Sequence, residues 1–161
     1  MKPGILSLPS GTALPALGLG VLLCFADCPR VSAGGLLREV YTGISGDTIA
    51  DLMSSPKFPD TPDATNIIQE FEAPTDADDY YGQRVRGFIL PPTTGSYRFW
   101  IASDDNSVLF LSTSEDPNAK QEIAGVPGWT SSREWDKYAE QESASISLQA
   151  GQAYYVEALM K

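Results

Sequence analysis

The sequence has 161 residues, of which 42% are hydrophobic, and it carries a formal net charge of −10 at pH 7 with no histidine. This length suits one domain, since a single hydrophobic core is commonly built from about 100–150 residues. The acidic balance argues against nucleic acid or an anionic membrane as a partner, because both attract clustered Lys and Arg.

The first 33 residues have the pattern of a cleavable signal peptide. Lys2 gives a positive start, an apolar stretch covers residues 14–25, and the small residues at 31–33 suit cleavage after this segment. A membrane span needs about 20 apolar residues, whereas this stretch contains a proline and several glycines and stops at Asp27. We therefore expect export to the cell surface, the extracellular space or the periplasm, with an uncleaved anchor as the alternative.

Both cysteines, Cys24 and Cys28, lie inside this segment, so the mature chain, residues 34–161, is expected to have no disulfide and no thiol chemistry. The segment also contains two basic residues and one acidic residue, and its removal changes the net charge from −10 to −11. Such acidity is compatible with cation binding outside the cell, although solubility alone is the alternative explanation for most of the carboxylates.

From residue 36 onward, apolar side chains follow the period of two that is typical of strands, and turn residues interrupt the runs. The expected strands are 36–41, 66–72, 83–90, 97–102, 108–111, 121–124, 143–148 and 153–161. One short helix is expected over 48–53 with Asp47 as its cap, and a proline-rich loop follows over 56–62. A long irregular loop is expected over 125–141.

Two hairpins are expected from these strands. One joins 83–90 to 97–102 through the turn at 93–96, and the other joins 143–148 to 153–161 through Ala150-Gly151. Many short antiparallel strands without helices between them predict an all-β fold, either a sandwich or a barrel.

Three segments carry a resemblance to a known family. They are Tyr81-Gly82-Gln83-Arg84-Val85-Arg86-Gly87, Gly95-Ser96-Tyr97-Arg98-Phe99-Trp100-Ile101-Ala102-Ser103-Asp104-Asp105 and Leu148-Gln149-Ala150-Gly151-Gln152-Ala153-Tyr154-Tyr155-Val156-Glu157-Ala158-Leu159. They resemble the protective-antigen-type domain, which is named for the anthrax toxin component and also occurs in bacterial glycosidases and yeast flocculin adhesins. The resemblance covers residues 35–161, and its most specific part is Gly-x-Tyr-x-Phe-x-Ile-x-Ser-Asp-Asp.

The resemblance implies an antiparallel β-sandwich or barrel that, in sugar-binding members, holds a calcium ion through paired aspartates joined by a cis peptide bond. The ion then coordinates sugar hydroxyls. Asp104 and Asp105 match the paired aspartates. In many members a turn and a final apolar strand follow the position of Lys161, so we expect a C-terminally truncated domain of a longer polypeptide.

The residues support a calcium site independently of the family. Calcium takes six to eight oxygen ligands, and Asp104, Asp105 and Asn106 offer oxygens of the right kind. Successive side chains of a regular strand face opposite ways, so the two aspartates can hold one ion only if the backbone between them is kinked. The alternative is that 103–107 is a solvated loop whose aspartates cap local amides. A second acidic run, 76–79, lacks the glycine and glutamate spacing of a helical calcium loop and is predicted to be a solvated turn.

Aromatic side chains in the long loop are candidates for stacking on a sugar ring. Trp129, Trp135 and Tyr138 lie there, whereas Trp100 lies in a strand and is expected in the core. The alternative is that the loop aromatics cover one end of the β core, which is the more common place for an indole.

The residue content also excludes several kinds of chemistry. Without histidine there is no serine–histidine catalysis and no zinc site built on imidazole, and no phosphate-cradling or dinucleotide motif is present. No carboxylate pair sits in a recognisable catalytic frame, so we expect a protein that is not an enzyme.

The sequence therefore predicts a calcium-dependent, lectin-like module of a secreted or cell-surface protein, with a glycan or polysaccharide as its partner. Its ligand-binding residues would be Asp104, Asp105, Asn106, Trp129 and Trp135, and Asp104 and Asp105 would hold the metal. Two alternatives are a structural or adhesive module that contacts other proteins, and a targeting appendage of a larger extracellular enzyme.

Overall fold

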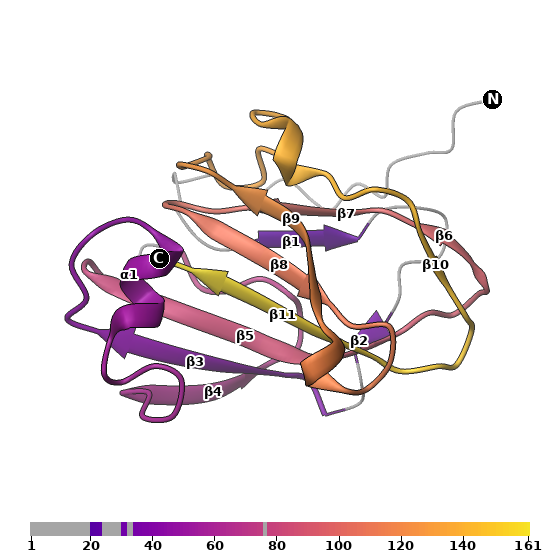
Figure 1. Ribbon diagram of the computed structural model, residues 1–161, viewed down its shortest axis with the longest axis horizontal. Coiled ribbons are helices and arrows are strands. Elements are labelled where there is room, and N and C mark those ends of the chain that lie inside the picture. The colour runs from indigo at the N-terminus through magenta and orange to yellow at the C-terminus, as the bar shows by residue number, and fades with distance from the viewer. Residues whose placement is uncertain (1–19, 24–29, 32–33, 76) are drawn as a thin grey trace, which may run out of the picture.

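The computed structural model describes residues 20–23, 30–31, 34–75 and 77–161, and it confirms the all-β class (Figure 1). The strands are β1 (Gly20–Leu23), β2 (Arg30–Val31), β3 (Leu36–Thr42), β4 (Ala64–Ile68), β5 (Tyr81–Leu90), β6 (Gly95–Tyr97), β7 (Phe99–Ala102), β8 (Ser107–Leu111), β9 (Gln121–Val126), β10 (Ile146–Leu148) and β11 (Tyr154–Met160). The helical elements are α1 (Ile49–Ser54), η1 (Pro117–Ala119) and η2 (Ala139–Gln141). No helix among the described residues is long and apolar enough to cross a membrane.

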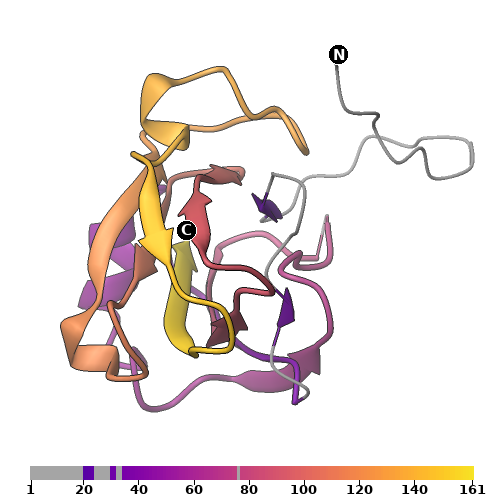
Figure 2. The same cartoon turned by 90° about the vertical axis from the view of Figure 1, so that its right-hand side faces the viewer.

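The strands form two layers (Figure 2). One layer is a seven-stranded antiparallel sheet in the order β4-β3-β5-β11-β8-β9, with β2 paired to β5, and the other consists of the pairs β1–β7 and β10–β6. The main hydrophobic core lies between the two layers, because every second side chain of a strand points to the same face of its sheet. Val85 and Ile89 of β5 and Phe99 and Ile101 of β7 belong to this core, and all four are fully buried. The fold is therefore a β-sandwich.

The predicted signal peptide lies mostly outside the described residues. Its two described pieces are β1, which pairs with β7, and β2, which pairs with β5. Cleavage of this segment stays a prediction.

The two predicted hairpins are wrong. β5 pairs with β3 and β11, whereas β6 pairs with β10 and β7 pairs with β1. At Pro91-Pro92 the chain leaves the large sheet for the second layer, and at Ala150-Gly151 it returns. Each of these turns therefore joins the two layers of the sandwich instead of joining neighbouring strands of one sheet.

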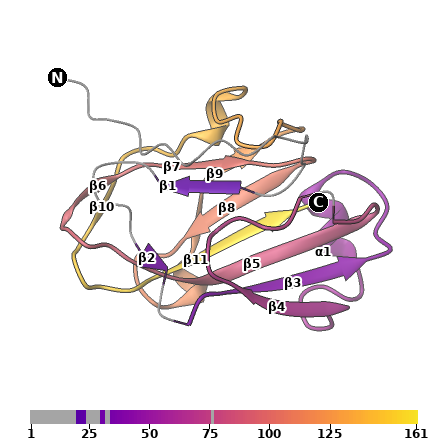
Figure 3. The same cartoon turned by 180° about the vertical axis from the view of Figure 1, so that it is seen from behind.

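Helix α1 covers part of the outer face of the large sheet, at the end where β11 terminates (Figures 1 and 3). Leu52 of α1 is fully buried against Tyr41 and Leu159 in a second, smaller hydrophobic cluster. The expected cap was Asp47, but Thr48 is the N-cap: its hydroxyl accepts from the Asp51 amide, and the Asp51 carboxylate accepts from the Thr48 amide. This capping box satisfies two free amides at the start of the helix.

Next to this cluster, the outer face carries a buried ionic group. Glu39 of β3 is 4% exposed and accepts hydrogen bonds from Arg84 (2.6 and 2.9 Å) and Arg86 (2.9 and 3.1 Å) of β5. Burial by itself would raise the pKa of the Glu39 carboxyl, but the two guanidinium groups outweigh it and hold the pKa below its ordinary value. Glu39 is therefore ionised and paired across the β3–β5 ladder.

Candidate functional site

Strand register brings three distant parts of the chain to one edge of the large sheet. In the antiparallel ladders Met160 at the end of β11 lies opposite Gln83 near the start of β5 and opposite Ser107 at the start of β8. The turn before β5, the turn before β8 and the end of β11 therefore meet. They enclose a pocket of about 440 Å³, which is lined by Ala77, Asp78, Asp79, Tyr80, Tyr81, Asp104, Asp105, Met160 and Lys161.

The paired aspartates lie in the turn between β7 and β8, and the peptide bond that joins Asp104 to Asp105 is cis. Ser103, which is 1% exposed, holds this turn through hydrogen bonds on its buried side. Its hydroxyl donates to the Asp105 carbonyl (2.6 Å) and lies 2.6 Å from the Ser107 hydroxyl. Its backbone is held by Thr130, whose hydroxyl accepts from the Ser103 amide (3.0 Å) and whose amide donates to the Ser103 carbonyl (2.7 Å).

The surroundings of Asp105 disfavour its ionised form. Partial burial raises the pKa of the Asp105 carboxyl, and the hydrogen bond and charge of Asp104 raise it further. The charge of Asp47 acts in the same direction, whereas the Lys161 ammonium lowers this pKa. The burial and negative charge that raise this pKa disfavour an ionised Asp105 carboxylate, and a cation bound beside it would favour the ionised form.

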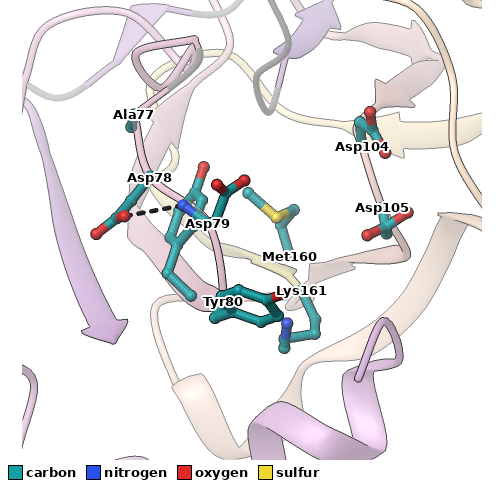
Figure 4. A pocket seen from close by; sticks show the side chains of 9 residues that line it. Ala77, Asp78, Asp79, Tyr80, Asp104, Asp105, Met160 and Lys161 are labelled. Atoms are coloured by element: carbon teal, nitrogen blue, oxygen red, sulfur yellow. Dashed lines mark hydrogen bonds between the residues drawn. The ribbon is translucent and has the colours of Figure 1, made fainter. Parts of the chain in front are cut away.

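The acidic turn before β5 forms the other side of the pocket. Figure 4 shows Asp79 and Tyr80 across the pocket from Asp104 and Asp105, with Met160 and Lys161 between the two sides. Asp78 and Asp79 are exposed, as expected of a solvated turn, and the Asp78 carboxylate accepts from the Asp79 amide (2.8 Å). The proximity of this turn to the paired aspartates was not predicted. The one feature of the sequence that could have indicated it is that the turn directly precedes β5, the strand that pairs with β11.

Asn106 has a structural role in this arrangement. Its side-chain amide donates to the Val126 carbonyl (2.8 Å) and accepts from the Ile49 amide (3.3 Å), while its backbone carbonyl accepts from the Lys161 amide (2.9 Å). Asn106 thus ties the start of β8 to β9, to α1 and to the end of β11. It is not among the described residues that line the pocket.

The loop aromatics lie outside the pocket lining. Trp129 is 51% exposed and adjoins Thr130, which is bonded to Ser103, but the Lys137 ammonium lies 3.2 Å from its ring centroid. Trp135 is half-buried, and Tyr138 lies 5.4 Å from the same ammonium and packs against the main core. Of the predicted ligand-binding residues, the structure therefore brings together Asp104 and Asp105 in the pocket and leaves Asn106, Trp129 and Trp135 outside its lining.

The donor set of the pocket suits a hard cation. Calcium prefers carboxylate, carbonyl and water oxygens, and Asp104 and Asp105 present adjacent carboxylates in a pocket that is open to water and ligand hydroxyls. No cluster of three or more acidic, His or Cys side chains with metal-binding geometry occurs in the part of the chain that the structure describes. Protein carboxylates from this turn would therefore supply part of the coordination shell, and oxygens from water or ligand would supply the rest.

Known proteins share this domain. A family model described as the PA14 domain, the protective-antigen type, matches residues 35–160. An N-acetyl-beta-glucosaminyl-glycoprotein 4-beta-N-acetylgalactosaminyltransferase 1 of Mus musculus is 44% identical over 85 residues, which are 50% of this chain and 8% of the transferase. Fibrocystin of Canis lupus familiaris is 28% identical over 144 residues, which are 81% of this chain and 3% of fibrocystin. The chain thus spans 8% or less of the length of these relatives.

Proposed function

Because this chain belongs to the PA14 domain family, we propose that it is a calcium-dependent carbohydrate-binding module that acts by binding and not by catalysis. Family membership supports a carbohydrate-binding or adhesion module. The observation that carries the calcium-dependent form is the position of Asp104 and Asp105, two adjacent carboxylates that line one pocket at the edge of the large sheet.

In this proposal Asp104 and Asp105 hold the calcium ion, which supplies a Lewis-acidic centre for neighbouring sugar hydroxyls. The protein's own part is to hold the turn that carries the two carboxylates, and the hydrogen bonds of Ser103 to the Asp105 carbonyl, to Ser107 and to Thr130 do this. The turn follows β7, whose Phe99 and Ile101 are buried in the main core, so the site is anchored to the sandwich.

A glycan array, run with calcium and with a chelator, tests the proposal. We expect calcium-dependent signals for the purified chain and their loss in Asp104→Asn, which removes one ligand charge at nearly constant shape. The matched control is Glu115→Gln, which neutralises an exposed carboxylate outside the pocket lining and should bind as the wild type does. An array that stays blank with calcium, on protein shown to be folded, would contradict the proposal.

The location and context of the module belong to the same proposal. The predicted signal peptide supports export, and the matches to much longer proteins support a module that serves a larger secreted or cell-surface polypeptide, such as an adhesin or an extracellular enzyme. Mass spectrometry of the exported chain tests this point, because cleavage as predicted makes Gly34 the first residue.

A further inference from the structure

Tyr80 stands out among the exposed large hydrophobic side chains. It is 71% exposed, more than Met53, Ile67 or Trp129, and unlike these three it lines the pocket with Asp104 and Asp105. Single exposed apolar side chains are common on protein surfaces, so exposure alone assigns no function. The position of Tyr80 and the backbone that presents its ring are the informative features.

The backbone of Tyr80 is in the left-handed region, with φ of 54°. A bulky residue rarely adopts this conformation, and such outliers concentrate at functional sites. The Tyr80 carbonyl accepts from the Ile44 amide (2.7 Å), and the next residue, Tyr81, packs against the main core. These contacts fix a backbone that directs the Tyr80 ring out into the pocket.

The ring of Tyr80 has no competing aromatic or cationic neighbour. Within the described part of the chain, Tyr80 makes no aromatic stacking or cation–π contact, while the Lys137 ammonium lies over one face of the Trp129 ring, 3.2 Å from its centroid. Figure 4 shows the Tyr80 ring across the pocket from Asp104 and Asp105. A ligand held by the paired aspartates would therefore have an aromatic surface available on its other side.

We propose that Tyr80 packs against the apolar face of a bound sugar ring. The inference rests on the proposed function and adds to it a positioning surface for the ligand. Aromatic rings offer apolar area at little conformational cost, and the pocket volume lies within the range of small-ligand sites.

Isothermal titration with methyl glycosides of galactose, glucose and mannose, in saturating calcium, tests the role of Tyr80. Tyr80→Asn removes the ring but tolerates the left-handed backbone, and Tyr80→Phe keeps the ring. We expect Tyr80→Phe to bind as the wild type does and Tyr80→Asn to bind about tenfold more weakly, with equal calcium affinity and melting temperature in all three proteins. Wild-type sugar affinity in Tyr80→Asn, or a joint loss of calcium binding and thermal stability, would overturn the assignment.

A failure of the Tyr80 assignment differs from a failure of the proposed function, in which the wild type binds no sugar in calcium or Asp104→Asn binds sugar unchanged.

Discussion

At the scale of single residues, we expect Lys161 to oppose cation binding. Its ammonium lowers the pKa of the Asp105 carboxyl, so it already supplies positive charge where we place the calcium ion. We expect Lys161→Gln to bind calcium about three- to tenfold more tightly in calorimetric titration, because the competing charge is removed. Lys137→Gln, which neutralises an exposed lysine outside the pocket lining, should leave the affinity unchanged. Weaker calcium binding by Lys161→Gln would contradict this electrostatic role.

A residue of the site could be predicted from the sequence only where its immediate neighbours in the chain indicate its role. Asp104 and Asp105 are adjacent in the sequence and end a recognisable strand, so residue chemistry and family resemblance both pointed to them. Asn106 has the same polar chemistry, but its amide is used by the backbone of Val126 and Ile49. That difference depends on which distant strands pack beside the turn, and local sequence does not contain it.

At the scale of elements, the buried pair between β3 and β5 makes stability depend on pH. The folded-state pKa of Glu39 is lowered, so its contribution is fully present above the unfolded value of about 4.3 and is lost as the pH falls through the folded pKa. Glu39→Gln leaves two arginines without their shared partner and should cost about 3 kcal/mol at pH 7.

Denaturant unfolding at pH 7 and pH 3 measures the dependence. We expect the stability difference between wild type and Glu39→Gln to shrink at pH 3, because Glu39 in the unfolded state is then largely protonated, whereas its lowered folded-state pKa resists protonation. Glu115→Gln, at an exposed carboxylate, controls for the loss of one negative charge. An equal difference at both pH values would show that the ion pair is not the source of the stability.

The sequence predicted strands correctly where apolar and polar residues alternate. It failed to predict which strands pair with one another. The alternation of Val85 and Ile89 with Arg84 and Arg86 gives both strand and faces correctly, since it reflects one side in the core and one outside. The turns at Pro91-Pro92 and Ala150-Gly151 look like hairpin turns locally. They cross between layers because the neighbours of β5 are β3 and β11, a long-range choice that turn composition does not encode.

At the scale of the whole molecule, the acidic charge and the polar pocket at one edge of the large sheet lead to the same interpretation. A chain of net charge −10 gains electrostatically from a bound divalent cation, and a ligand that binds only the folded state raises its stability. Calcium should therefore stabilise the protein, by about 2.7 kcal/mol at a free concentration 100-fold above its dissociation constant. The two-layer sandwich that supports the pocket could be predicted from the period-two pattern and from the family resemblance. The set of residues that line the pocket could not, because it depends on the register in which β11 pairs with β5 and β8.

The measurement that tests the central claim most directly is a calcium titration by calorimetry on the purified chain, with Asp104→Asn and Glu115→Gln beside it. We expect one saturable site in the wild type and in Glu115→Gln, and an affinity at least about 100-fold lower in Asp104→Asn, since loss of a ligand should exceed loss of its outer-shell partner. No saturable calcium binding by the wild type, or equal binding by Asp104→Asn, would contradict a metal site at the paired aspartates.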